Sequence, residues 1–95
     1  MKLRPVLVLT GPVGPVPEVL VAYISSVIPS QLLPSDLILD PALPQFRSTN
    51  LKTISALRLH KLATIHCASL VRYLGHLETD AWLVAAQTLM DFLGH

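Results

Sequence analysis

Between residues 5 and 39, the apolar positions form short, nearly continuous runs bounded by proline, glycine and hydroxyl residues. Runs of this length that are rich in Val, Ile and Leu are typical of buried β-strands. The pattern predicts strands at Pro5–Thr10, Val19–Ser25 and Asp36–Leu39, with the first two joined as a hairpin by a wide loop. A proline is tolerated at the first position of a strand, so Pro5 does not argue against this assignment.

The pattern is less regular between residues 44 and 74. Residues 44–50 are mostly polar and are expected to form a loop. Ser55–Leu59 and Leu62–Ile65 predict two short strand segments, with a kink near His60-Lys61 between them. Leu70–Leu74 alternates weakly between apolar and polar residues, which indicates a short last strand.

The hydrophobic period changes near the C-terminus. Apolar residues recur at helical spacing over Trp82–Leu93, which predicts an amphipathic helix of about four turns. Residues 78–80 supply capping groups and negative charge at its start, and Gly94 suits its C-terminal cap. Short strands followed by one terminal helix predict a mainly β fold, a small curled sheet or barrel with the helix packed on it.

Composition indicates one small domain that spans residues 1–95. A chain of 95 residues can bury one core. Its residues are 52% hydrophobic and only 14% charged, so some apolar surface is expected to lie against a partner, most simply a second copy. The single cysteine excludes an internal disulfide framework. We expect a cytoplasmic protein, because neither a signal peptide nor a bilayer-spanning apolar run is visible.

A net charge of +1 hides an uneven distribution of charges. Asp36 and Asp40 flank an apolar run and are expected to be solvated strand ends. Residues 41–77 contain no acid and five cations, namely Arg47, Lys52, Arg58, Lys61 and Arg72. Such a basic segment is a modest electrostatic footprint for a polyanion, and ordinary solvated surface is the alternative.

Four collinear segments carry a resemblance to a known family. Leu3–Leu9 is a cation followed by proline and an aliphatic strand, and Val21–Ser25 is a strand that ends in Ile-Ser. Leu51-Lys52 with Ser55–Ile65, and then Leu70–Leu77, follow in order, ahead of a helix that ends Phe92-Leu93-Gly94. Together they resemble the MazF/PemK group of type II toxin–antitoxin toxins. The resemblance implies an SH3-like barrel with a C-terminal helix that acts as a homodimer.

The resemblance also implies an activity. Members of this group cleave single-stranded mRNA at specific sequences without a metal or other cofactor, and a cognate antitoxin restrains them. The family's catalytic pair, an arginine before proline and a threonine at the end of the next strand, corresponds here to Arg4 and Ser25. A fixed guanidinium can pair with two phosphate oxygens as charge develops on them. Serine keeps the hydroxyl of threonine but lacks the β-branch that restricts its χ1 angle.

On this interpretation, further RNA contacts are expected from other polar and aromatic residues. The expected contacts are Ser26, Lys52, Arg58, Lys61 and Tyr73. No metal site is expected, because the histidines and the cysteine lack the spacing of zinc ligands. Relative to the family the chain is N-terminally short, since an opening strand of the Gly-Asp-Ile-Val type is missing before the Arg-Pro motif. Without this strand the sheet should have an unpaired edge. Either the start is truncated, or a partner chain completes the sheet.

Two other functions remain open at the level of sequence. The chain could be a non-catalytic interaction domain on the same scaffold, which pairs with an antitoxin or with itself. The second of these is a DNA-gyrase poison, which a related toxin family on this fold implies.

Overall fold

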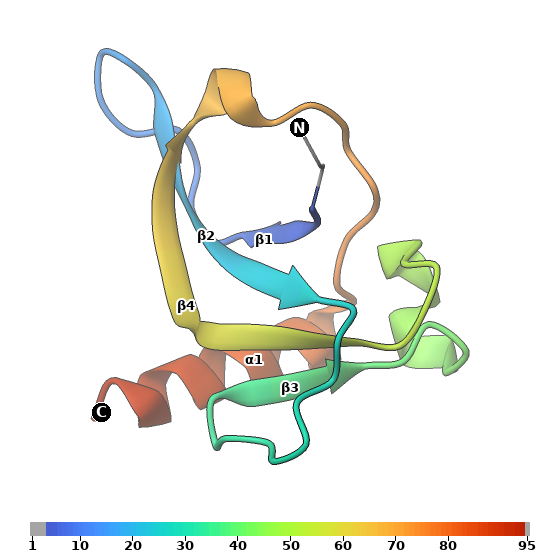
Figure 1. Cartoon of the computed structure of the whole chain (residues 1–95). Helices are drawn as coiled ribbons and strands as arrows, with labels where there is room; N and C mark the ends of the chain where they lie inside the picture. The colour runs from blue at the N-terminus through green and yellow to red at the C-terminus, as the bar shows by residue number, and fades with distance from the viewer. Residues whose placement is uncertain (1–3, 95) are drawn as a thin grey trace.

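Four strands form one antiparallel sheet in the order β1-β2-β4-β3 (Figure 1). The computed structural model describes residues 4–94. Its elements are β1 (Val6–Val8), β2 (Glu18–Ser25), β3 (Asp36–Leu39), the 3-10 helix η1 (Pro44–Thr49), β4 (Ser55–His66), the 3-10 helix η2 (Cys67–Ser69) and α1 (Thr79–Phe92). The mainly β fold with a C-terminal helix is thus confirmed.

The long strand β4 curls the sheet. Its first half pairs with both β2 and β3, and its second half continues along β2 alone. The register with β2 jumps between Ala22, which lies opposite Leu62, and Tyr23, which lies opposite Arg58. The residues skipped by this jump form a bulge that bends the strand sharply, as Figure 1 shows. The predicted kink is confirmed, but the two predicted segments are one continuous strand.

The hairpin of β1 and β2 is longer than the three residues of β1 suggest. Beyond the strand ends, Ile24 donates its N–H to the Pro5 carbonyl at 3.3 Å and Leu9 donates to the Leu20 carbonyl at 2.8 Å. Farther along, Val13 and Glu18 exchange two backbone hydrogen bonds and close the loop. The backbone pairing therefore follows most of the predicted strand.

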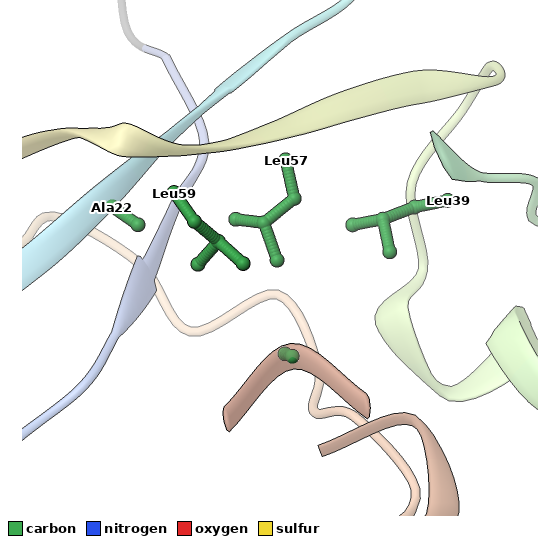
Figure 2. Packing of buried hydrophobic residues seen from close by; sticks show 5 residues of the cluster. Ala22, Leu39, Leu57 and Leu59 are labelled. Atoms are coloured by element: carbon green, nitrogen blue, oxygen red, sulfur yellow. The ribbon is translucent and has the colours of Figure 1, made fainter. Parts of the chain in front are cut away.

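The core lies between the concave face of the sheet and α1. Figure 2 shows Ala22, Leu39, Leu57 and Leu59 projecting from three strands toward the helix. These side chains are at most 1% exposed, and Ala85 of α1 closes the cluster from the other side. Leu57 and Leu59 lie two residues apart on the face of β4 that meets α1, as the period of a strand requires, and Arg58 between them is only half-buried.

The segment after η2 departs from the prediction. Residues 70–74 form no strand, so the predicted last strand is wrong. The segment is held instead by η1, because Ser48 accepts a hydrogen bond from the His76 N–H at 2.9 Å and donates its hydroxyl to the His76 carbonyl at 2.8 Å. The Asn50 side-chain amide donates to the Leu74 carbonyl at 2.7 Å. These contacts bind the chain to a helix rather than to a neighbouring strand.

The C-terminal helix agrees closely with its prediction. It begins at Thr79 and is followed by Gly94, whose φ of +89° suits a glycine beyond a helix end. Glu78 occupies the N-cap but its side chain makes no capping hydrogen bond. Among residues 4–94 no helix combines the length and apolar character that a bilayer crossing requires.

Candidate functional site

Arg4 and Ser25 are placed by the register of the first hairpin. Val6 lies opposite Tyr23, and the bond from the Ile24 N–H to the Pro5 carbonyl carries the pairing past the end of β1. One more step in the same register sets Arg4 across from Ser25. Residues directly opposite in an antiparallel pair share one face of the sheet. The register therefore sets the two predicted catalytic residues opposite each other at the end of one hairpin. Their catalytic roles stay a prediction.

Hydrogen bonds fix the Ser25 hydroxyl at the end of β2. It accepts the Val27 N–H at 3.1 Å and donates to the Val27 carbonyl at 3.1 Å, in a local turn. This turn restricts the hydroxyl in much the way that a β-branched side chain would restrict it. To donate to a ligand, the hydroxyl must rotate its proton away from the Val27 carbonyl.

Arg4 lies at a groove between β1 and the segment of residues 69–77. The groove has a volume of about 660 Å³, and Ile65 and Trp82 complete its lining. Figure 1 shows this segment passing the open side of β1 on its way to α1. The lining contains the cations Arg4 and Arg72 together with His76, and it contains no Asp or Glu. An anionic ligand therefore meets no carboxylate on these walls.

The predicted RNA contacts are divided between the groove and the rest of the surface. Tyr73 lines the groove and is 78% exposed, so its ring is free to stack on a base. Ser26 is exposed directly after Ser25. Lys52, in the turn before β4, and Lys61, at the bend of β4, are exposed but lie outside the groove lining. The groove thus unites Arg4 and Tyr73, but not the two lysines.

Arg58, the remaining predicted RNA contact, is bound to a buried carboxylate. Its Nε donates to Asp36 Oδ1 at 2.7 Å, and the Asp36 side chain is 0% exposed. The Leu33 N–H donates to the other carboxylate oxygen at 2.9 Å. The expectation that Asp36 is a solvated strand end is therefore wrong, because the β3–β4 pairing places it directly opposite Arg58.

This ion pair belongs to a polar cluster at the bulge of β4. Burial raises the pKa of Asp36, but the Leu33 N–H and the hydrogen bond and charge of Arg58 outweigh it, so the pKa falls below the ordinary value of 3.8. His60 contributes in the same direction. Its Nδ1 shares a 2.7 Å hydrogen bond with the Ser35 hydroxyl. The cluster joins β3 to β4 and does not line the groove.

The site predicted from sequence leaves out Arg72, His76 and Trp82, which line the groove. Arg72 was recognised only as one cation of the basic segment. The residue in the sequence that could have indicated this wall of the groove is Gly75. A Cβ at this position would clash with the Ser48 carbonyl oxygen. A glycine required by such close packing marks the place where the segment is fixed against η1 and forms a wall.

Comparisons with known proteins agree with this fold. The structure is similar to the Mycobacterium tuberculosis toxin MazF-mt6, with a TM-score of 0.73 and 23% identity over 95% of this chain and 85% of that chain. It is also similar to an Mtb toxin known from a crystal structure, with a TM-score of 0.71 and 22% identity over 93% of this chain and 90% of that one. No curated protein sequence matches the chain.

At these identities the structural likeness shows the fold, a curled four-stranded half-barrel with a C-terminal helix. The family is shown by sequence, since the model of the PemK-like, MazF-like toxins of type II toxin–antitoxin systems matches residues 1–93. The chain therefore belongs to this family of toxins.

Proposed function

We propose that this toxin is an endoribonuclease that cleaves single-stranded mRNA without a metal ion. The proposal is carried by the hairpin register, which sets Arg4 across from Ser25, and by the groove beside Arg4, whose walls hold cations and no carboxylate. Membership of the PemK/MazF-like toxins supports it. The proposal treats residues 1–95 as a single domain that acts in the cytoplasm, where mRNA is found.

The residues suit a cleavage in which the RNA supplies its own nucleophile. The ribose 2′-oxygen attacks the adjacent phosphorus as it loses its proton, and the bond to the 5′-oxygen breaks as that oxygen gains a proton. The products are a 2′,3′-cyclic phosphate and a 5′-hydroxyl. Negative charge grows on the non-bridging oxygens, which a guanidinium at Arg4 can hold with two parallel hydrogen bonds. Losing one preorganised donor of this kind typically costs about 2.7–4 kcal/mol of transition-state stabilisation, which is about 100- to 1,000-fold in rate.

Ser25 is proposed to supply a second donor to the same phosphate. Its hydroxyl oxygen is already held by Val27, so rotation of the proton alone is required. Tyr73 is proposed to stack on a neighbouring base, and Ser26, Lys52, Arg58 and Lys61 to contact the RNA backbone, with Arg58 restricted by its bond to Asp36. Stacking on an aromatic ring contributes about 1–3 kcal/mol per base.

A type II toxin has a cognate antitoxin, and we propose a second copy of the chain as a further partner. Large apolar side chains that are exposed along α1 and at Leu93 directly after it support self-association. These are Leu83, Val84, Met90, Phe92 and Leu93, between 49% and 62% exposed. Apolar surface that is gathered on one helix favours a protein interface.

The test is a cleavage assay on labelled single-stranded RNA in excess EDTA. We expect fragments that end in a cyclic phosphate, and a rate about 100-fold lower for Arg4→Ala. Arg47→Ala is the matched control, because Arg47 is an exposed arginine on η1 outside the groove lining. Ser25→Ala should lower the rate, and Ser25→Thr should retain it. Intact RNA at high concentrations of folded protein would rule the proposal out.

A non-catalytic interaction domain is the second candidate. Two observations favour it: the Ser25 hydroxyl already donates its hydrogen bond to the Val27 carbonyl, and the lining of the groove is largely apolar. In that case the RNA stays intact while the protein still binds an antitoxin or itself. Size-exclusion chromatography beside the cleavage assay separates the two candidates.

A further inference from the structure

A row of side chains crosses the sheet beside the pair of Arg4 and Ser25. Tyr23 lies two residues before Ser25 on β2, so both side chains project from the same face of the sheet. The strands β1, β2 and β4 are neighbours in that order (Figure 1), and the register sets Tyr23 opposite both Val6 and Arg58. Two residues along a strand span about 7 Å. One nucleotide of an extended RNA strand bridges such a distance.

The ring of Tyr23 is flanked by its two cross-strand neighbours and is still open to a ligand. Directly opposite residues have their Cβ atoms about 4.5–5.5 Å apart, which places Val6 and Arg58 on either side of the ring. Tyr23 is 38% exposed, half the exposure of Tyr73. A side chain that is already confined loses less conformational entropy when a base stacks on it. Tyr23 is therefore an ordered stacking surface next to the proposed phosphate contact.

Arg58 presents two unused donor groups beside this ring. Its Nε is bound to Asp36 at 2.7 Å, and the guanidinium makes no other hydrogen bond within residues 4–94. Every buried side-chain nitrogen and oxygen in that part of the chain has a hydrogen-bond partner, so the two Nη groups reach solvent. The Asp36 carboxylate offsets the charge of Arg58 and repels a phosphate. A neutral base edge is repelled far less, because it carries no net charge.

Guanine is the base whose edge fits two parallel donors. Its O6 and N7 are both acceptors, and an arginine pairs with them through two hydrogen bonds. Adenine presents its N6 amino group beside N7, so a donor would meet a donor. Cytosine likewise presents an amino group, and uracil presents one acceptor on this edge. As a purine, guanine also covers more of the Tyr23 ring than a pyrimidine does.

We propose that Tyr23 and Arg58 form a guanine subsite next to the cleaved bond. The base stacks on the Tyr23 ring, and its O6 and N7 accept hydrogen bonds from the two Nη groups of Arg58. The inference rests on the proposed RNA cleavage and adds its preferred substrate, a single strand with guanine beside the scissile phosphate. Arg58 then contacts a base, which refines the RNA contact proposed for it above.

Base analogues test the subsite atom by atom with the full chain. Sequencing the fragments of a random single-stranded RNA locates the cleaved bonds, and oligonucleotides that differ only in the two flanking bases follow. We expect guanine on one side of the bond to raise kcat/KM about 5- to 150-fold over adenine. Replacing that guanine with 7-deazaguanine, which lacks N7, or with 2-aminopurine, which lacks O6, should each lower kcat/KM about fivefold. The same analogues remote from the bond are the control and should change nothing.

Two pairs of variants separate stacking from base recognition. Tyr23→Ala should lower kcat/KM about 5- to 150-fold, whereas Tyr23→Phe keeps the ring and should retain it. Arg58→Lys keeps the charge beside Asp36 but lacks the planar pair of donors, so the preference for guanine over adenine should fall to about 1. Arg47→Lys, an exposed arginine on η1, should keep the preference. The analogues keep the test valid if Arg58→Lys fails to fold.

Three results would each overturn the subsite while the protein still cleaves RNA. They are equal kcat/KM for guanine and adenine on both sides of the bond, an unchanged rate with 7-deazaguanine, and an unchanged rate for Tyr23→Ala. The proposed function survives all three, so the two proposals are distinguishable. RNA left intact by the wild-type protein would overturn both, because the subsite is defined beside a cleaved bond.

Discussion

The ion pair of Arg58 and Asp36 makes the sharpest prediction about stability. Arg58→Gln removes the 2.7 Å hydrogen bond and the arginine charge beside a carboxylate that is 0% exposed. It leaves that carboxylate with the Leu33 N–H and with His60 Nδ1, which lies 3.9 Å away. Removing one partner of a buried ion pair costs about 3–5 kcal/mol. The Arg58 side chain is 17% exposed, so water can partly take over its contact with the carboxylate. We therefore take the lower end, about 3 kcal/mol, which lowers Tm by about 12–24 °C in a domain of this size.

The pH dependence follows from the direction of the Asp36 pKa. The folded state lowers it from 3.8, chiefly because the bonds from Leu33 and Arg58 outweigh the effect of burial. A carboxyl with a depressed pKa stabilises the fold above its unfolded pKa, and this contribution is lost as the pH falls through the folded pKa. The difference in unfolding free energy between wild type and Arg58→Gln should therefore be largest near pH 7. It should shrink below about pH 4.

Urea unfolding followed by circular dichroism measures the unfolding free energy of each variant, and repeating it at several pH values gives the pH dependence. Arg47→Gln is the control and should change the unfolding free energy by at most about 0.5 kcal/mol, because Arg47 is an exposed surface residue. The double variant Asp36→Asn with Arg58→Gln should recover part of the loss, since the two residues are in direct contact. A cost below about 0.5 kcal/mol for Arg58→Gln at pH 7, or an equal cost at pH 7 and pH 3, would refute the reasoning.

Three further substitutions test the wall, the core and the groove. Gly75→Ala should destabilise the fold by about 2 kcal/mol or more in urea unfolding, because its Cβ would clash with the Ser48 carbonyl; a wild-type midpoint would show that the segment is not fixed there. Leu57→Ala should cost about 3–5 kcal/mol, because Leu57 is 0% exposed at the centre of the core, and a cost under about 1 kcal/mol would contradict this packing. Tyr73→Ala should leave stability within about 0.5 kcal/mol, because the side chain is 78% exposed. It should weaken RNA binding by about 1–3 kcal/mol in fluorescence anisotropy, and unchanged affinity would exclude the stacking role.

The elements with a strong local pattern were predictable from sequence. The helix over Thr79–Phe92 and the strands at Asp36–Leu39 and Val19–Ser25 follow from hydrophobic period and turn residues alone. The kink near His60-Lys61 was also visible, because the apolar run is interrupted there. Whether such an interruption ends a strand or bulges it depends on the partner strand, and only the jump in register with β2 shows that β4 continues.

Features that depend on contacts distant in sequence were not predictable. Residues 70–74 have a weak strand pattern, but Asn50 and Ser48 bind the segment to η1 instead. Asp36 follows a turn and precedes an apolar run, as a solvated residue would, yet the β3–β4 register buries it opposite Arg58. Long-range pairing therefore decided which charges are free, and this is why the predicted RNA contacts did not all fall in one place.

The candidate site was predicted in part. Arg4 and Ser25 were chosen through the resemblance, and the hairpin register sets them opposite each other. The groove beside them could not be predicted, because its far wall comes from a segment that sequence assigned to a strand. From sequence, Arg72 on that wall is only one of the five cations of the basic segment.

The most direct test of the central claim is the ratio of RNA cleavage rates between wild type and Arg4→Ala in excess EDTA, with Arg47→Ala alongside. We predict a ratio of about 100 for Arg4→Ala and about 1 for Arg47→Ala, with all three proteins equally folded. Equal rates for wild type and Arg4→Ala would contradict the account, because RNA cleavage would then not depend on the phosphate contact proposed here.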